Sequence, residues 1–436
     1  MKNIFQKKGN MLLKDSESNT ELTIDELVKG FTNGCKNTQT IGVESEKLLV
    51  YKDSNKAVKY EDVVKVLNYF DETKWQKLYD GENLMGLKSD FGVISLEPGS
   101  QVELSLLPFD NLDKISVKLL SFYSELRLAA EKIGAIVLDS GIQPVSTFDD
   151  IHIIPKKRYE YMTKYLPTKN LTPFVMMRET AGIQSNFDYK SEQDAIRKLS
   201  LAMKMSPIVS SIYANSPVRN SKLTGYKSFR ANSWLNVDED RCGYVSKKLF
   251  DKHLEFTFKD YVEVLLDVPM IFIQRGNTCF GTNQTFREFM QNGHNGLTAE
   301  ISDWQNHISL YFPDVRLKTY VEVRNHDAQN EQMTLSVPAF WKGIMYNSSA
   351  FEEVEKILSK YSYDDFIKLR KETPIKAIEA RLGFHKVLDF VKDFFEISYE
   401  SLKQNNLQEE KYLEPVFEYI NAKRVPADNI IDEFEN

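Results

Sequence analysis

The sequence predicts an α+β fold in which an antiparallel sheet is flanked by helices and followed by a helical C-terminal portion. Strand-like runs, in which apolar and polar residues alternate, recur along the chain, and amphipathic segments with helical spacing separate them. From about residue 333 onward, nearly the whole chain has helical spacing, in two or three long amphipathic segments. The strand-like runs are 41–50, 94–109, 181–189 and 318–326.

The composition excludes several classes of protein. The 436 residues are 42% hydrophobic and 12% aromatic, which is enough for a large core. The net charge of −7, from 56 basic and 63 acidic residues, argues against nucleic acid or an anionic membrane as a partner. The N-terminal stretch has no apolar run typical of a secretory signal, and no uncharged run is long enough to span a membrane. Three widely spaced cysteines predict neither a disulfide framework nor a zinc site. We therefore expect a soluble, cytoplasmic protein of the size of an enzyme; the sequence predicts no oligomeric state.

The first elements follow from local sequence signals. Thr23 and Glu26 form a capping box ahead of apolar Leu27, which predicts that a helix starts at Thr23. The strand-like run 41–50 follows it, and residues 60–80 have helical spacing.

The middle of the chain repeats this pattern of strands and helices. Pro98 and Gly99 break the strand region 94–109 in its middle. Helices are expected over 111–132, from Ser191 to about Tyr213, and over 257–268. No linker separates these elements from the helical portion. We expect one domain of mixed strands and helices over 1–335 and a helical portion over 336–436 packed on it.

Polar residues occupy alternate positions of the strand-like runs, so that each strand has one polar face. An ordinary solvated sheet face explains any single strand. Four strands together favour another explanation, because acids and amides dominate where a solvated face would mix in lysine and threonine. The same-face sets are Glu44 and Glu46; Gln101, Glu103 and Ser105; Gln184, Asn186 and Asp188; and Tyr320, Glu322, Arg324 and His326.

A shared sheet would bring several carboxylates together. Two like charges ~4 Å apart repel by ~4 kcal/mol at an effective dielectric constant near 20. Protons or cations must offset such repulsion, and Mg²⁺ with phosphate is a common solution for all-oxygen ligands. The carboxylates expected to converge are Glu44, Glu46, Glu103 and Glu322, with Glu97 beside the Pro-Gly break as a fifth.

The familiar nucleotide and metal motifs are absent from the sequence. It contains no GxxxxGK[ST], GxGxxG, HExxH, CxxC or GxSxG segment, and its six histidines show no metal-ligand spacing. P-loop, Rossmann and zinc-hydrolase chemistry are therefore excluded.

A series of segments, in order, resembles the plant and proteobacterial type of glutamate–cysteine ligase. IGVESEK (41–47) is similar to that family's IGTEHEK, and ISLEPGSQVELS (94–105) is similar to ISLEPGGQFELS. The resemblance is close over about residues 35 to 350. The other segments are PKKRYEYMTKYLP (155–167), MRETAGIQSNFDY (177–189), YANSPV (213–218), SFRANSWLNVDEDRCG (228–243), YVEVLLDVPMIF (261–272), SDWQNHISLYFPDVRLKTYVEVRNHDA (302–328) and VPAFWKGIMY (337–346).

The resemblance implies a fold and a reaction. The fold is a curved antiparallel half-barrel of the glutamine synthetase type, flanked by helices, whose concave polar face holds ATP and Mg²⁺. In the reaction, the γ-carboxylate of glutamate attacks the γ-phosphorus of ATP, and the amine of cysteine then displaces phosphate from the acyl phosphate. Positioning and charge neutralisation carry most of such catalysis.

The resemblance also implies roles for particular residues. Glu44, Glu46, Glu97, Glu103 and Glu322 match the acids expected to bind metal. Glu103 and Arg324 are the candidate catalytic residues, with Arg324 stabilising charge on the transferring phosphate. A salt bridge that only orients Glu322 is the structural alternative for Arg324.

Further candidates bind substrate. The planar guanidinium of Arg230 suits bidentate binding of the glutamate α-carboxylate, and the Trp234 indole either walls that pocket or packs in the core. The remaining candidates are Gln101, Gln184, Asn186 and Arg241; buried amides that link strands are the alternative for Gln184 and Asn186.

The sequence departs from the family pattern at a few positions. Ser100 replaces the second glycine of EPGG, and Ser45 replaces the histidine between the first two acids. No proposed metal ligand is lost, which argues against a non-catalytic paralogue that only binds a nucleotide or an amino acid. The amine acceptor stays open between cysteine and another amine.

Overall fold

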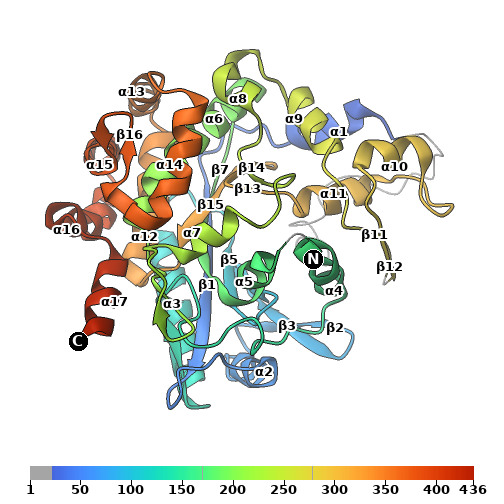
Figure 1. Cartoon of the computed structure of the whole chain (residues 1–436), viewed down its shortest axis with the longest axis horizontal. Helices are drawn as coiled ribbons and strands as arrows, with labels where there is room; N and C mark the ends of the chain where they lie inside the picture. The colour runs from blue at the N-terminus through green and yellow to red at the C-terminus, as the bar shows by residue number, and fades with distance from the viewer. Residues whose placement is uncertain (1–21, 169, 277) are drawn as a thin grey trace.

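The computed structural model describes residues 22–168, 170–276 and 278–436 (Figure 1). In this part of the chain, a nine-stranded sheet has the order β14-β15-β7-β1-β5-β4-β3-β2, and β6 pairs with the far half of β1. All of its pairings are antiparallel. Its strands are β1 Ile41–Tyr51, β2 Gln76–Asp80, β3 Asn83–Lys88, β4 Gly92–Leu96, β5 Val102–Leu106, β6 Ala135–Leu138, β7 Gly182–Phe187, β14 Val315–Leu317 and β15 Val321–Asp327.

Short strand pairs lie outside this sheet, and β10 with β13 is a parallel pair. They are β8 Val218–Arg219 with β9 Lys222–Leu223, β10 Cys242–Gly243 with β13 Phe312–Pro313, β11 Phe272–Arg275 with β12 Thr278–Gly281, and β16 Arg381–Leu382 with β17 His385–Lys386.

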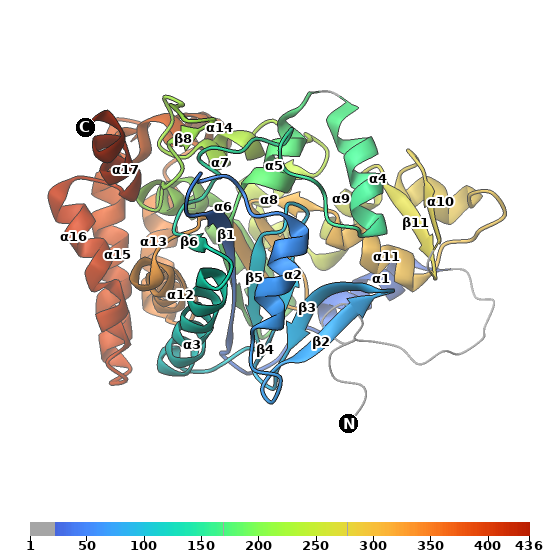
Figure 2. The ribbon, with the colours of Figure 1, turned by 90° about the horizontal axis from the view of Figure 1, so that it is seen from below.

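Helices cover one face of the sheet and surround the other (Figures 1 and 2). The first group is α1 Ile24–Thr32, α2 Tyr60–Asn68, α3 Leu112–Glu131, α4 Lys157–Tyr165, α5 Thr172–Glu179, α6 Glu192–Ile212, α7 Phe229–Trp234, α8 Lys247–Asp251, α9 Phe258–Leu266, α10 Phe286–Asn292 and α11 Ile301–Ser309. The second group is α12 Glu331–Met345, α13 Ser348–Leu358, α14 Tyr363–Lys376, α15 Val387–Gln404, α16 Glu414–Ala422 and α17 Pro426–Glu435. Short 3₁₀ turns are Leu166–Thr168, His253–Glu255, Ala377–Glu379 and Glu409–Leu413.

The apolar side chains of the strands form the core with α3, α6 and α12, which pack on that face of the sheet. Val43, Leu104 and Val323 are at most 1% exposed. The same core continues through the C-terminal helices to Ala427. The opposite face carries the polar residues and stays open to a cavity, which confirms the alternation expected for β1, β5 and β7.

Most elements expected from the sequence are present, including the Thr23 capping box of α1. The helix expected over 60–80 is wrong in its second half, because α2 ends at Asn68 and residues 76–80 form β2. Thr73 donates from its backbone N–H and its hydroxyl to Asp71 Oδ1, a turn that separates the helix from the strand.

The C-terminal portion is divided more finely than expected. The described residues beyond 330 form six α-helices rather than two or three, because capping residues such as Asn347 and Ser362 start new helices. The division at residues 335 and 336 stays a prediction, and the boundary that it names falls inside α12.

A β-bulge in β15 changes which side chains face the polar side. Val323 pairs with Ser185, but His326 pairs with Ile183, so β15 has one extra residue between these pairs. His326 therefore lies on the apolar face, against the rings of Tyr213 and Trp341. The expectation that His326 shares the face of Glu322 and Arg324 is wrong for this reason.

Candidate functional site

The polar face of the sheet lines a cavity of about 270 Å³, which we call the carboxylate cavity. Glu44 and Glu46 come from β1, Glu103 from β5, and Glu97 from the turn between β4 and β5. Four of the five predicted acids thus lie in one cavity. Its other lining residues are Ser95, Pro98, Gln101, Lys156, Arg158, Tyr159, Met162, Met176, Met177, Thr180, Gln184, Arg230, Trp234, Ser309, Phe312, Arg316 and Arg324.

Glu46 and Glu103 are directly opposite each other in the β1–β5 ladder. Like charges in such cross-strand pairs destabilise a sheet. Burial, with the neighbouring charge of Glu97 adding to it, raises the pKa of Glu46 to about 7 even though Arg230 opposes this rise. Burial also raises the pKa of Glu97, and burial with three neighbouring carboxylates raises that of Glu103 well above its ordinary value. The metal-free site therefore favours protons on these acids.

Cations face the acids across the cavity. Lys156 and Arg158 belong to the N-terminal end of α4, and burial lowers the pKa of Lys156 despite the nearby charge of Glu97. Arg324 and Arg316 come from β15 and β14. Except for Arg324, these residues were not among the sequence candidates. The basic segment PKKR (155–158) was the available signal for the first two.

Glu322 is fully buried and lies behind the lining residues of the cavity. Its carboxylate accepts from Arg316 Nε at 2.6 Å, from Arg324 Nη1 at 3.0 Å and from Lys318 Nζ at 3.0 Å. Burial acts to raise the pKa of Glu322, but these three cations outweigh it and hold that pKa well below the usual range. In this structure Glu322 orients cations, and its role as a metal ligand stays a prediction.

Arg230 is 4% exposed and lines the cavity with unused hydrogen-bonding capacity. Its Nη2 donates to the carbonyl oxygen of Arg324 at 3.1 Å, whereas its Nε and Nη1 have no hydrogen-bond partner. Burial lowers the pKa of this guanidinium. Its Nη1 is also 3.9 Å from Asp327 Oδ1, an ion pair too long for a hydrogen bond. A buried cation whose Nε and Nη1 make no hydrogen bond is suited to bind an anionic group. The Trp234 Nε1 beside it is also buried without a partner.

Each of the predicted amides makes a hydrogen bond within the protein, and Asn186 Oδ1 is buried without a partner. Gln101 Oε1 accepts from Gly99, and its Nε2 donates to the carbonyl oxygens of Met177 and Thr180, so that the β4–β5 turn is tied to α5. Gln184 Oε1 accepts from Arg324. Asn186 Nδ2 donates to Glu44 at 3.0 Å and lies outside the lining.

Arg241 lies away from the carboxylate cavity. Its guanidinium donates to Asp238 Oδ2 at 2.6 Å and to the carbonyl oxygens of Leu310 and Pro269. These contacts hold the loop before β10, and they give Arg241 a structural role. Asp188 likewise lies outside the lining, where Thr38, Thr40 and Lys36 contact its carboxylate.

A ready-made metal site is not found. Within residues 22–168, 170–276 and 278–436, no three His, Cys, Asp or Glu side chains are grouped closely enough to hold a metal ion. The four carboxylates line one cavity without closing on one point, and Mg²⁺ stays a prediction.

The family model for glutamate-cysteine ligase family 2 matches residues 40–433. The chain belongs to this glutamate–cysteine ligase family. Glutamate–cysteine ligase A, chloroplastic, of Oryza sativa subsp. indica is 32% identical over 421 residues, which cover 95% of this chain and 85% of that protein. Glutamate–cysteine ligase, chloroplastic, of Arabidopsis thaliana is 30% identical over 443 residues, which cover 98% of this chain and 84% of that protein.

Solved structures of the glutamate–cysteine ligase type share the fold. The crystal structure of glutamate–cysteine ligase from Francisella tularensis in complex with AMP matches with a TM-score of 0.53 at 15% identity, covering 91% of this chain and 85% of that chain. The α+β fold with an antiparallel sheet and the family membership expected from the sequence are thus confirmed.

The cytoplasmic location expected from the sequence is wrong, since the curated plant relatives of this ligase family are named chloroplastic. The expectation rested on the lack of an apolar N-terminal run, which is typical of secretory signals, whereas plastid transit peptides are amphipathic. Over the described part of the chain, no helix combines the length and apolar character needed to cross a membrane.

Proposed function

We propose that the protein is an ATP- and Mg²⁺-dependent ligase that joins the γ-carboxylate of glutamate to the amine of cysteine. The observation that carries this proposal is the pairing of Glu46 with Glu103 in a cavity that cations also face. Acids that repel one another beside Lys156, Arg158 and Arg324 suit a metal-bound triphosphate, because metal ions offset the acids and the cations bind the phosphate oxygens.

The carboxylates fit Mg²⁺ by their chemistry. Glu44, Glu46, Glu97 and Glu103 supply hard oxygen ligands, and burial, together with repulsion from neighbouring acids, raises the pKa values of the last three. When bound, Mg²⁺ would supply positive charge that neutralises the acids and the phosphate oxygens.

The protein side chains would bind glutamate and stabilise the transferring phosphoryl group. Arg230 would bind the α-carboxylate of glutamate with its free Nε and Nη1, and Trp234 would wall the same pocket. A γ-carboxylate oxygen attacks the γ-phosphorus, a C–O–P bond forms and ADP leaves. Arg324, held by Glu322, would stabilise the charge of the transferring phosphoryl group. The cysteine amine then attacks the acyl carbon, and phosphate leaves with one former carboxylate oxygen.

Product identification tests this function. The protein is incubated with ATP, Mg²⁺ and glutamate, with cysteine or with a panel of other amines, and products are identified by mass spectrometry. We expect γ-glutamylcysteine together with one ADP and one phosphate. A better acceptor in the panel would replace cysteine in the assignment, and no ADP release with any amine would favour a non-catalytic paralogue.

A further inference from the structure

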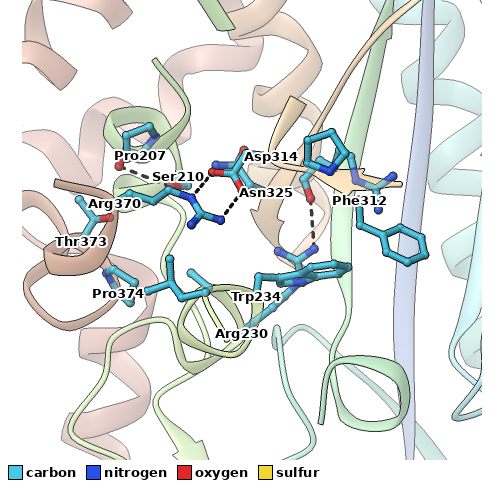
Figure 3. Close-up of a pocket in the computed structure, with 14 residues that line it drawn as sticks. Pro207, Ser210, Arg230, Trp234, Phe312, Asp314, Asn325, Arg370, Thr373 and Pro374 are labelled. Atoms are coloured by element: carbon cyan, nitrogen blue, oxygen red, sulfur yellow. Dashed lines mark hydrogen bonds and ion pairs between the residues drawn. The ribbon is translucent and has the colours of Figure 1, made fainter. Parts of the chain in front are cut away.

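Acids in and around the carboxylate cavity are held in two different ways. In the first way, cations bind both oxygens of the carboxylate. A smaller cavity beside the carboxylate cavity shows this arrangement: Arg370 donates from Nε to Asp314 Oδ2 at 2.5 Å and from Nη2 to Asp314 Oδ1 at 2.7 Å (Figure 3). Glu322 is similar, since Arg316 donates from Nε to Oε2 and from Nη2 to Oε1. Such two-point ion pairs are complete without a ligand.

Glu103 and Glu44, which line the carboxylate cavity, are held in the second way. Glu103 Oε1 accepts from Ser105 Oγ at 2.8 Å and from Ser95 Oγ at 3.3 Å. Glu44 Oε1 accepts from Asn186 Nδ2 at 3.0 Å. The donors are uncharged, and they bind one oxygen of each acid. The other oxygen, Oε2, makes no hydrogen bond to the residues that the structure describes.

The arginines of the cavity leave these two acids without an ion pair. Arg316 and Arg324 both pair with Glu322. Within the described residues, no lysine or arginine pairs with Glu44 or Glu103 in the same way. Their counter-charge must therefore come from a proton or from a cation that enters the cavity.

Strand register gives Glu103 its two serines. Ser95 is its direct partner in the β4–β5 ladder, and Ser105 follows two residues later in β5, on the same face of the sheet. Two hydroxyls thus reach one carboxylate from different directions. Because rotation of the carboxylate would break these hydrogen bonds, the serines fix which oxygen of Glu103 stays available.

The amide of Asn186 is oriented by Glu44. Its Nδ2 donates to Glu44, whereas its Oδ1 is buried without a hydrogen-bond partner among the described residues. An unpaired buried acceptor costs about 1–3 kcal/mol, but the flipped amide would set two acceptor oxygens against each other. Gly42, opposite Asn186 in the β1–β7 ladder, leaves room for this contact, since an added β-carbon would lie 3.2 Å from Asn186 Nδ2.

We propose that the side chains of Ser95, Ser105 and Asn186 position the metal-binding acids. They hold one oxygen of Glu103 and of Glu44, and they leave the other oxygen of each acid to a divalent cation. This inference rests on the proposed function. Carboxylates that bind metal ions are themselves held by hydrogen bonds, and uncharged donors suit this task because they orient an acid without pairing with its charge.

Binding of Mn²⁺ measures the metal site apart from turnover. Mn²⁺ takes the same oxygen ligands as Mg²⁺, and electron paramagnetic resonance measures the free ion while the protein is titrated with Mn²⁺ alone. We expect Ser105→Ala and Asn186→Leu each to raise the Kd of Mn²⁺ about tenfold, the lower end of the usual loss for hydrogen-bond partners of metal ligands. Ser95→Ala should have a smaller effect, because its hydrogen bond is longer. In turnover assays, a higher Mg²⁺ concentration should restore most of the lost rate.

Two further variants separate positioning from general damage. Ser105→Thr keeps the hydroxyl and suits a strand, so we expect its Kd for Mn²⁺ to stay within about twofold of the wild-type value. Ser401→Ala is the matched control, because this buried serine donates to the Gly343 carbonyl oxygen at 2.6 Å and contacts none of these acids. Its Kd for Mn²⁺ should be unchanged. Melting curves of each variant verify folding.

An unchanged Kd for Mn²⁺ in Ser105→Ala or in Asn186→Leu would overturn the role of that residue. Equal losses in Ser105→Thr and Ser105→Ala would overturn the role of the hydroxyl, and a wild type that binds no Mn²⁺ would overturn the whole inference. Failure of the proposed function is a separate outcome, because the wild-type protein would then bind Mn²⁺ but release no ADP with glutamate and any amine.

Discussion

Gly182 donates its backbone N–H to Glu46 Oε2 at 2.6 Å. On the side where a β-carbon would stand, the guanidinium of Arg230 lies against the same glycine. One small residue therefore links an acid proposed to bind metal with the cation proposed to bind substrate. Any side chain at this position must displace Arg230 or break the contact with Glu46.

We expect Gly182→Ala to reduce turnover strongly, because the added methyl group meets Arg230 and also the His326 carbonyl oxygen at 2.9 Å. The KM for glutamate should rise more than the KM for ATP. Steady-state kinetics with each substrate varied in turn measure this. Gly30→Ala in α1 is the control, since nothing lies within 4 Å of its added methyl and alanine favours a helix by about 0.5–1 kcal/mol. Unchanged kinetics in Gly182→Ala would contradict the arrangement.

Removing one acid from the cluster should strongly reduce activity without harming the metal-free fold. We expect Glu46→Gln and Glu103→Gln to lower kcat by about 10²–10³-fold, as for other preorganised electrostatic groups. Their melting temperatures without metal should equal or exceed that of the wild type, because a member of a repelling set is lost. Mg²⁺ with ATP should raise the wild-type melting temperature more than those of the variants. Glu131→Gln, at the exposed end of α3, serves as the control. Clear destabilisation of the metal-free variants would count against the cluster.

The same acids predict how stability depends on pH. The pKa of Glu46 rises from 4.5 to about 7 on folding, so its stabilising contribution is complete below pH 4.5 and is lost as the pH rises through 7. Glu97 and Glu103 act in the same direction. The buried His326, whose pKa is lowered to about 3, acts oppositely, since its contribution is lost as the pH falls below 6.5.

Comparing Glu46→Gln with the wild type isolates the contribution of the Glu46 carboxyl group to this pH dependence. We expect the difference in unfolding free energy between Glu46→Gln and the metal-free wild type to grow in favour of the variant from pH 5 to 8. One proton accounts for at most about 1.4 kcal/mol per pH unit. Urea unfolding at several pH values measures it, and a difference independent of pH would show that Glu46 titrates normally.

The acids of the site were predictable because strand alternation is a local property. Glu44, Glu46 and Glu103 follow from a period of two in their own strands, and their shared cavity follows from one antiparallel sheet. Strand alternation could not predict Lys156 and Arg158. They lie at the start of a helix, whose residues have no fixed pairing with the strands of the sheet. The bulge that redirects His326 likewise left no mark in the apolar–polar pattern.

Ser100 has a strained backbone conformation at a position where the sequence departs from the family pattern. It replaces a family glycine and adopts a φ of 69°, a left-handed conformation that L-residues avoid. We expect Ser100→Gly to stabilise the protein by about 1 kcal/mol, because the strain is relieved. Ser302→Gly is the matched control with the opposite sign, since it places glycine inside α11. Thermal unfolding compares the two, and a destabilised Ser100→Gly would show that the hydroxyl matters more than the strain.

The central claim is that glutamate is activated by phosphorylation in the carboxylate cavity. It is tested most directly with glutamate carrying ¹⁸O in its γ-carboxylate, by mass spectrometry of the phosphate released with ATP, Mg²⁺ and cysteine. The account predicts one ¹⁸O atom in each phosphate, because the amine displaces phosphate from an acyl phosphate. Phosphate without ¹⁸O, formed alongside γ-glutamylcysteine, would contradict it.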